Sequence, residues 1–270
     1  MSAAAPQRVA GLVLRQFYLL RGSISRILPL FVWVMIDIML WGFITRYLNT
    51  VSGRGMNFVP VLLGAALLWD FLTRVMHGVS MAFLEDVWSR NLLNLFATPL
   101  TIGEYLGGLV LSSMATSMVG LAVMLALATG AFGLSYAALG AMLVPFLLVL
   151  FLFGIALGIT GSAIVLRLGP AAEWFVWPIP AIVSPFAGVF YPVSTLPPWM
   201  QAVAHALPPS YVFEGMRRIV SGGAFAPVTL AWGALLAALY IALACWLFAR
   251  VHAHVVRSGL LARYSSEGVS

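Results

Sequence analysis

Six long apolar runs constrain the fold of this chain more than any other feature of its sequence. About 20 apolar residues in an α-helix cross the roughly 30 Å hydrocarbon core of a bilayer. The runs cover residues 28–45, 58–84, 105–129, 136–166, 175–191 and 228–248, and the fifth contains Pro178, Pro180 and Pro185. Because a backbone in lipid must satisfy its own hydrogen bonds, we expect helices there. The sequence predicts an all-α membrane protein with six transmembrane helices, in a single domain over residues 1–270.

Composition supports lipid as the solvent and excludes two functions. The 270 residues are 62% hydrophobic and 8% charged, whereas soluble domains are about 45–50% apolar and about 25% charged. All 14 basic residues are arginines. A phosphate-binding P-loop needs a lysine, so the chain cannot hold ATP in that way. The arginines are scattered between apolar runs, a pattern typical of membrane topology signals and not of nucleic-acid binding.

The arginine distribution also predicts that both termini are cytoplasmic. If the N-terminus lies inside, six crossings return the C-terminus to the same side. The cytoplasmic segments then carry Arg8, Arg15, Arg21, Arg26, Arg90, Arg167, Arg250, Arg257 and Arg263, and the outer segments carry Arg46, Arg54, Arg217 and Arg218. This excess of positive charge inside agrees with the positive-inside rule.

Residues 1–26 are predicted to form a helix in the membrane interface. Arg8, Arg15, Arg21 and Arg26 alternate with leucine, valine and aromatic residues, as in helices that lie along a bilayer surface. Such a helix either only anchors the chain in membrane lipid or also contacts a cytoplasmic partner. The sequence leaves both interpretations open.

No pattern for an enzyme active site is present. The chain has no HExxH motif, no GxSxG motif and, at the membrane surface, no pair of clustered carboxylates with an adjacent histidine. Cys245 is the single cysteine, which excludes an internal disulfide and a cysteine metal site. We therefore expect no catalytic residue, no metal and no cofactor on this chain.

Four ionisable residues lie within the first two predicted spans: Asp37, Asp70, Arg74 and His77. A charge in lipid is costly unless it is paired or hydrated. The spacing of four lets Asp70 and Arg74 pair on one helix face, and helix geometry places Asp37 and Asp70 at about the same depth. The group forms either an ion-pair cluster that joins two helices or a polar patch facing a substrate path. A proton relay is disfavoured, because pairing with arginine keeps a carboxylate ionised.

Small residues in the fourth predicted span indicate close helix packing. Gly154 and Gly158 are four residues apart, and Ser162 continues the same spacing. In lipid, small residues at this spacing let two helix backbones approach each other.

The segment after the second predicted span is too short to cross a membrane. We expect an amphipathic cytoplasmic helix that ends at Pro99, followed by Thr101 capping the next helix with Glu104 three residues on. The residues of interest in this segment are Glu85, Arg90, Leu92, Leu95, Phe96 and Pro99.

The segment between the fifth and sixth predicted spans is too apolar for a free loop and too rich in proline for a crossing helix. Short re-entrant helices in the outer leaflet fit it best. Glu214 is spaced to pair with Arg217 or Arg218 on one helix face. The residues of interest are Pro192, Pro197, Pro198, Tyr211, Glu214 and Arg217.

At these two segments the sequence resembles the type-2 permease family of ATP-binding-cassette exporters. The first signature corresponds to Glu85, Arg90, the leucine-rich turn, Thr98-Pro99-Leu100 and Glu104; the second corresponds to Pro192, Leu196 to Trp199, Pro208, Tyr211, Glu214 and Arg217. The family usually has a glycine after the loop arginine, whereas Asn91 follows Arg90 here. The resemblance implies that residues 88–98 form a coupling helix in a groove of a separate P-loop ATPase subunit, which holds ATP and Mg²⁺. The ATPase-coupling residues are then Glu85, Arg90, Leu92, Leu95, Phe96 and Pro99.

The resemblance further implies a homodimer of permeases with two ATPases in a bacterial inner membrane, with the substrate path between the permeases. We expect ATP-driven export of an amphipathic, lipid-linked or drug-like substrate. The alternative is a secondary transporter or channel that uses an ion gradient through Asp37, Asp70, Arg74 and His77. A third class, a membrane scaffold, would transport nothing.

Overall fold

The structure is a computed structural model that describes residues 4–22, 24–51, 59–134, 140–224 and 226–260. The described residues contain helices and no β-strand. The beginnings of the second and fourth predicted spans, at residue 58 and residues 136–139, lie outside this description, as do Arg54 and Arg263. The all-α prediction is confirmed.

Five helices in the described part of the chain are long and apolar enough to cross a membrane. They are α2 (Ile24–Val51), α3 (Gly64–Trp88), α5 (Ile102–Phe132), α6 (Leu143–Leu168) and α10 (Pro227–Arg257). A π-helical segment, η1 (Val59–Leu63), leads into α3, and a short 3-10 turn, η3 (Gly140–Met142), leads into α6. These helices correspond to five of the six predicted spans.

The predicted fifth span, residues 175–191, is not a helix of membrane length. The chain there forms a 3-10 helix, η4 (Pro170–Phe175), and a nine-residue helix, α7 (Ile179–Ala187). Nine residues rise only about 14 Å. Proline has no N–H to donate, so Pro178 and Pro180 limit the helix to a start near residue 179.

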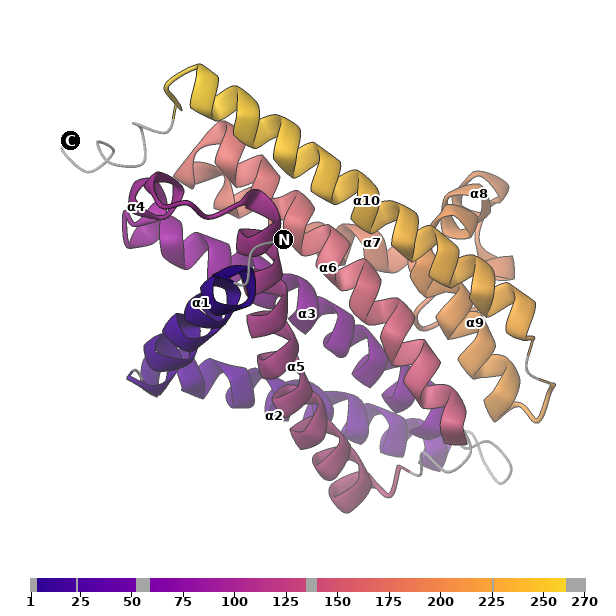
Figure 1. The fold of residues 1–270 in the computed structure, drawn as a ribbon. Coiled ribbons are helices and arrows are strands. Elements are labelled where there is room, and N and C mark those ends of the chain that lie inside the picture. Colours follow the sequence, from indigo (N-terminus) through magenta and orange to yellow (C-terminus); the bar gives the residue numbers. More distant parts are fainter. Residues whose placement is uncertain (1–3, 23, 52–58, 135–139, 225, 261–270) are drawn as a thin grey trace.

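Four shorter helices lie at the two ends of the long ones (Figure 1): α1 (Ala4–Arg21), α4 (Leu92–Ala97), α8 (Pro198–Ala206) and α9 (Pro208–Val220). The α4 helix lies near the last turns of α10, whereas α8 and α9 lie towards the opposite side of the molecule, with a 3-10 turn, η5 (Val193–Thr195), before them. The predicted short helix after the second span and the short helices between residues 192 and 220 are therefore present.

The core forms around α3, which packs against α5 on one side and α6 on the other, with α10 covering α6 (Figure 1). The predicted close packing of α6 is confirmed. A Cβ atom added at Gly158 would lie 2.8 Å from the backbone oxygen of Met76 and 2.7 Å from Cβ of Val79. The absence of side chains at Gly154 and Gly158 therefore sets the distance between α6 and α3.

Helix α2 is more peripheral than the other long helices. It packs mainly against α5 and η1 and contacts α3 little. Much of its apolar surface is exposed, including Trp33, Met39, Leu40, Phe43 and Tyr47. This exposed surface suits contact with lipid or another protein, and the separation from α3 leaves room for a cavity.

We expect the Gly158→Ala substitution to destabilise the protein by about 1–3 kcal/mol, because a methyl group there overlaps backbone atoms of α3 that cannot move independently. The matched control is Gly107→Ala on α5, where an added Cβ meets nothing within 4 Å. Thermal unfolding of both variants in mild detergent checks the prediction. Equal stability of the two variants would contradict the proposed packing.

Candidate functional site

The turn that ends α3 holds Arg90 in an unusual conformation. Arg90 has a positive φ of 55°, and the N–H of Asn91 donates to the backbone oxygen of Asp86 at 3.0 Å. A residue other than glycine in the left-handed region costs roughly 1–2 kcal/mol. The Arg90 side chain is exposed, so the strained turn presents a guanidinium group at the surface.

The α4 helix is fixed to the bundle by two of the residues predicted to couple it to a partner. Leu92 is fully buried. Phe96 lies with its ring centroid 5.4 Å from that of Tyr105 on α5 and 4.5 Å from that of His252 on α10. These two residues pack inward, Leu95 is half-buried, and the exposed residues around α4 include Trp88, Ser89, Arg90, Asn94, Ala97, Thr98 and Pro99.

Helix α5 begins with the predicted cap. The N–H of Glu104 donates to Thr101 Oγ1 at 3.3 Å, and the N–H of Thr101 donates to Glu104 Oε2 at 2.8 Å. Arg8 of α1 also donates to the Glu104 carboxylate, with its NH2 nitrogen 2.5 Å from Oε1. This hydrogen bond raises the pKa of the Arg8 guanidinium above its ordinary value. The interaction joins α1 to the start of α5.

A second ion pair joins α1 to the end of α3. Arg15 pairs with Asp86, which is 1% exposed, and the Tyr105 hydroxyl donates to Asp86 Oδ2 at 2.8 Å. Sequence reasoning missed Asp86 and treated Arg8 and Arg15 only as signals of an interfacial helix and of membrane orientation. Their spacing of seven places both arginines on one face of α1, which is the signal that indicates a shared docking surface.

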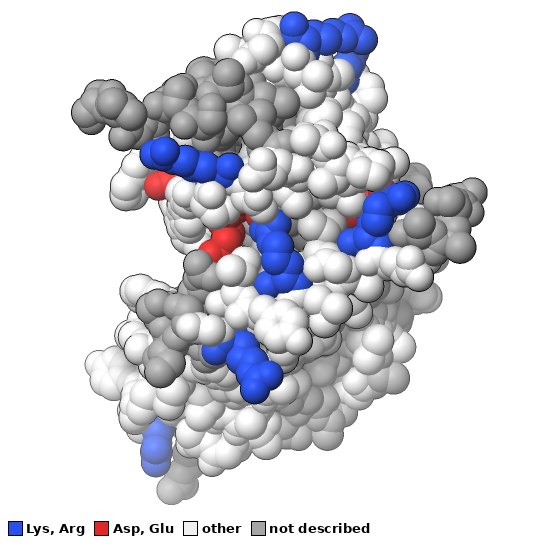
Figure 2. Space-filling view, turned by 60° about the vertical axis from the view of Figure 1, so that its left-hand side comes forward, with Lys and Arg blue, Asp and Glu red and all other residues white. Residues whose placement is uncertain are grey.

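Figure 2 shows the molecule from the side on which α1 and α4 lie. Charged residues are sparse on this face. Arginines are separated there by uncharged surface, and carboxylates lie beside some of them. This arrangement agrees with paired arginines at helix ends and does not form the continuous basic patch expected for nucleic-acid binding.

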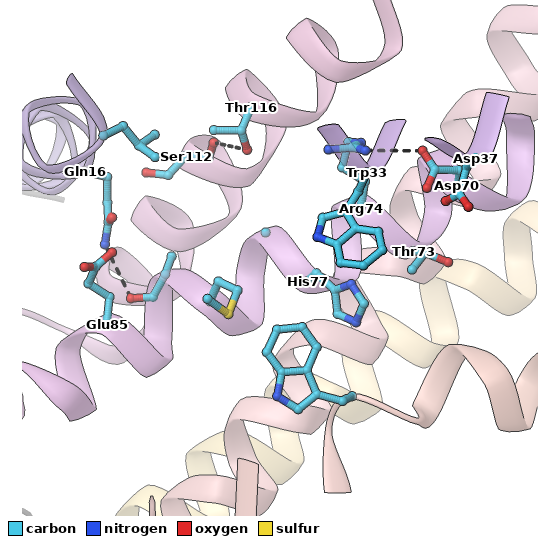
Figure 3. Close-up of a pocket in the computed structure, with 15 residues that line it drawn as sticks. Gln16, Trp33, Asp37, Asp70, Thr73, Arg74, His77, Glu85, Ser112 and Thr116 are labelled. Atoms are coloured by element: carbon cyan, nitrogen blue, oxygen red, sulfur yellow. Dashed lines mark hydrogen bonds and ion pairs between the residues drawn. The ribbon is translucent and has the colours of Figure 1, made fainter. Parts of the chain in front are cut away.

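A cavity of about 700 Å³ extends between α1, α2, α3 and α5 (Figure 3). All four predicted intramembrane residues, Asp37, Asp70, Arg74 and His77, line it, and so does Glu85 near the end of α3. The structure therefore brings together the polar residues of two helices that the sequence could place only at similar depth. Its lining also includes Gln16, Trp33, Ser112, Thr116 and Trp177.

The predicted pairing of Asp70 with Arg74 is confirmed, with 3.3 Å between Arg74 NH2 and Asp70 Oδ2. The Arg74 side chain lies over Gly120 of α5, where an added Cβ would be 2.6 Å from its Cδ. The His77 ring centroid lies 5.0 Å from that of Trp177. The ion pair belongs to one helix and lies on the wall of a cavity, so it does not itself join α2 to α3.

The family model described as ABC-2 type transporter matches residues 12–220. The chain belongs to the ABC-2 type transporter family. A comparison with curated proteins gave no match. The chain is therefore a multi-pass membrane permease subunit of an ABC transporter, and membership of this family implies association with an ATP-binding subunit.

The second predicted motif, between residues 192 and 217, lies away from the cavity and is held together by hydrogen bonds of Glu214 and Arg217. Arg217 NH2 donates to Glu214 Oε1 at 2.9 Å, which confirms the expected pairing within α9. The same carboxylate oxygen accepts the N–H of Val193 at 2.7 Å, and Arg217 NH1 donates to the backbone oxygen of Val189 at 3.1 Å. The two side chains thereby satisfy backbone groups of the turn that follows α7.

The remaining residues of that motif shape the helix ends of the permease. Pro197 directly precedes α8 and Pro198 occupies its first turn, where a missing N–H costs nothing. Pro192 precedes η5, and the Tyr211 hydroxyl donates to the backbone oxygen of His205 at 2.7 Å. The motif residues are brought near one another, and none of them lines the cavity.

We expect Arg15→Met to destabilise the permease by about 3–5 kcal/mol, because it leaves the buried Asp86 carboxylate without its cation. Adding Asp86→Asn should restore part of that loss, since the charge is then absent. Chemical denaturation in detergent measures both effects, with Arg21→Met, an exposed arginine on the same helix, as the control. Additive losses in the double variant would contradict the pairing.

Proposed function

We propose that the permease is the membrane subunit of an ATP-driven exporter. Two copies pair with two copies of a P-loop ATPase in a bacterial inner membrane, and both termini lie in the cytoplasm. The complex moves an amphipathic, lipid-linked or drug-like substrate outward, and α4 is the coupling helix. Hydrolysis takes place on the ATPase, because this chain has no lysine for a P-loop.

The observation that carries the proposal is the physical continuity between the α4 surface and the cavity. Phe96 packs α4 onto Tyr105 of α5, and Tyr105 hydrogen-bonds Asp86 of α3. Arg15 and Arg8 tie α1 to the same two helices. Helices α1, α3 and α5 all contribute walls to the cavity. A force applied at α4 by a partner therefore reaches three walls of the cavity through packed contacts and ion pairs.

The distribution of arginines supports a cytoplasmic α4 end. Helix α1 and the last turns of α3, α6 and α10 lie at the α4 end of the molecule (Figure 1), and with the turn after α3 they contain Arg8, Arg15, Arg21, Arg90, Arg167, Arg250 and Arg257. The last turns of α2 and helix α9, which contain Arg46, Arg217 and Arg218, lie towards the other end. Positive residues concentrate on the cytoplasmic side of membrane proteins. This orientation makes the exposed surface of α4 available to a soluble ATPase.

Residues 170–192 form the fifth of the six crossings as a broken segment. Trp88 Nε1 donates to Glu173 at 2.9 Å, Trp177 lies against His77, and Phe190 stacks on Trp41 at 4.3 Å between ring centroids. His77 lies about 16 Å along α3 from Trp88. These contacts support a path in which residues 170–192 run alongside α3 from the α4 end towards α8 and α9. Helix α10 then returns the chain to the cytoplasm.

The test is purification of the full chain together with the products of its neighbouring genes, in mild detergent and then in lipid nanodiscs. We expect a P-loop ATPase to co-purify and its hydrolysis to depend on the permease. Isolation of the chain alone, with solute transport driven by an ion gradient, would overturn the proposal and favour direct use of Asp37, Asp70, Arg74 and His77.

Variants of Arg90 separate its charge from its backbone conformation. Arg90→Ala and Arg90→Gly should both lower permease-dependent ATPase activity by about tenfold, the loss expected for one charge-assisted contact. Only Arg90→Gly relieves the backbone strain, so it should be the more stable of the two. Arg218→Ala, an exposed arginine on α9, is the control. Wild-type ATPase activity in both Arg90 variants would show that Arg90 is not part of the coupling surface.

A further inference from the structure

The membrane-embedded end of the cavity carries an excess of negative charge. Asp37 and Asp70 both line this end, and Arg74 is the arginine that accompanies them within the described lining. Arg74 pairs with Asp70, whereas Asp37 makes no ion pair or side-chain hydrogen bond within the part of the chain that the structure describes. A carboxylate at this depth is costly unless a positive charge approaches it. The charge of Arg74 acts on both carboxylates, and a second cation would be stabilised beside Asp37.

The surfaces beside this charge are aromatic. Trp33 of α2 is 63% exposed and Trp177 is 42% exposed, and both line the cavity. Figure 3 shows Trp33 on the same side of the space as Asp37, Asp70 and His77. The face of an indole ring attracts cations, most strongly where water is excluded. An organic cation satisfies both the carboxylate and the aromatic walls, whereas a hydrated metal ion would leave the indoles unused.

Polar atoms of the wall also lack partners. Thr73 Oγ1 and His77 Nε2 are buried without a hydrogen-bond partner in the described residues, and both residues line the cavity. Buried polar groups in folded proteins are usually hydrogen-bonded. A ligand or the water that accompanies it supplies partners that the protein itself does not provide.

The dimensions admit a molecule with a charged head and a long apolar body. The cavity of about 700 Å³ falls within the range of about 300–1,000 Å³ that holds drug-sized ligands. It reaches from Asp70 to Glu85 along α3, about 22 Å of helix. Its wall between these points includes Met81 and Leu20, which suit an apolar chain or a further ring.

We propose that this cavity binds an organic cation with an aromatic or apolar body, with the positive charge beside Asp37 and the body against Trp33 and Trp177. The assignment rests on the proposed export function and names the class of substrate. An anionic head group does not fit the same position. Arg74 is held by Asp70 and packed on Gly120, so an anion there would face two carboxylates.

A pair of probes with the same shape and opposite charge tests the proposal. Radiolabelled tetraphenylphosphonium and tetraphenylborate are added to the full-length permease in phosphatidylcholine nanodiscs, and binding above that of empty nanodiscs is measured. We expect saturable binding of tetraphenylphosphonium that tetraphenylborate does not displace. Equal binding of the two probes, or preference for the anion, would overturn the proposal.

Substitutions locate the bound cation. Asp37→Asn should weaken tetraphenylphosphonium binding by about tenfold or more, the effect expected for a charge-assisted contact, and Asp37→Glu should restore part of it. Trp177→Leu should weaken binding while Trp177→Phe retains most of it, because an aromatic face remains. The control is Glu173→Gln, a carboxylate outside the cavity lining whose amide oxygen can still accept from Trp88. Unchanged tetraphenylphosphonium binding in Asp37→Asn would contradict the placement of the cation beside Asp37.

Binding without ATP separates this proposal from the proposed function. If an ATPase co-purifies and is coupled through α4, yet tetraphenylphosphonium does not bind, the substrate class is wrong and the exporter proposal stands. If the cation binds and no ATPase associates, export is wrong and with it the assignment of the cation as an exported substrate. Stimulation of ATP hydrolysis by the cation, lost in Asp37→Asn, supports both proposals together.

Discussion

Hydrocarbon offers no partner for a peptide group or a charge, and the arrangement of polar groups in this permease follows from that limit. Most charged side chains of the described residues lie near helix ends. The charges deeper in the bundle meet at one cavity, where Asp70 pairs with Arg74. Polar residues at membrane depth are tolerated where protein or water can surround them. The cavity is therefore the place in the bundle where these charges meet.

The same limit explains why the α1 and α4 region is held firmly to the bundle. Asp86 is buried, and its carboxylate holds both Arg15 of α1 and Tyr105 of α5. Moving α1 away from α3 would leave a buried charge unpaired, which is strongly unfavourable. Helix α4 is attached to the same group of helices through Phe96. Ion pairs that are costly to break hold α1 to the ends of α3 and α5, and the packing of Phe96 holds α4 to the same group.

Interactions between neighbouring turns of one helix could be predicted from spacing alone. The Asp70–Arg74 pair, the Thr101–Glu104 capping box and the Glu214–Arg217 pair each span three or four residues. The pairs Arg8–Glu104 and Arg15–Asp86 were not predicted, because they join residues far apart in the sequence. Leu92 shows the same difficulty: its apolar character predicted a helix face but not whether that face meets the bundle or a partner.

The sequence by itself determined the membrane character of the chain, the long helices, the two motif segments and the residue types available for chemistry, because these depend on composition and on contacts within a few residues. Only the tertiary structure decided that residues 170–192 form a broken segment, that Leu92 and Phe96 pack inward, and that Asp37 shares a cavity with Asp70, Gln16 and Trp177. Those outcomes depend on how closely helices approach. That distance depends on the size of the residues at the contact. Gly154 and Gly158 have no side chain, and this matters only once α3 lies against α6.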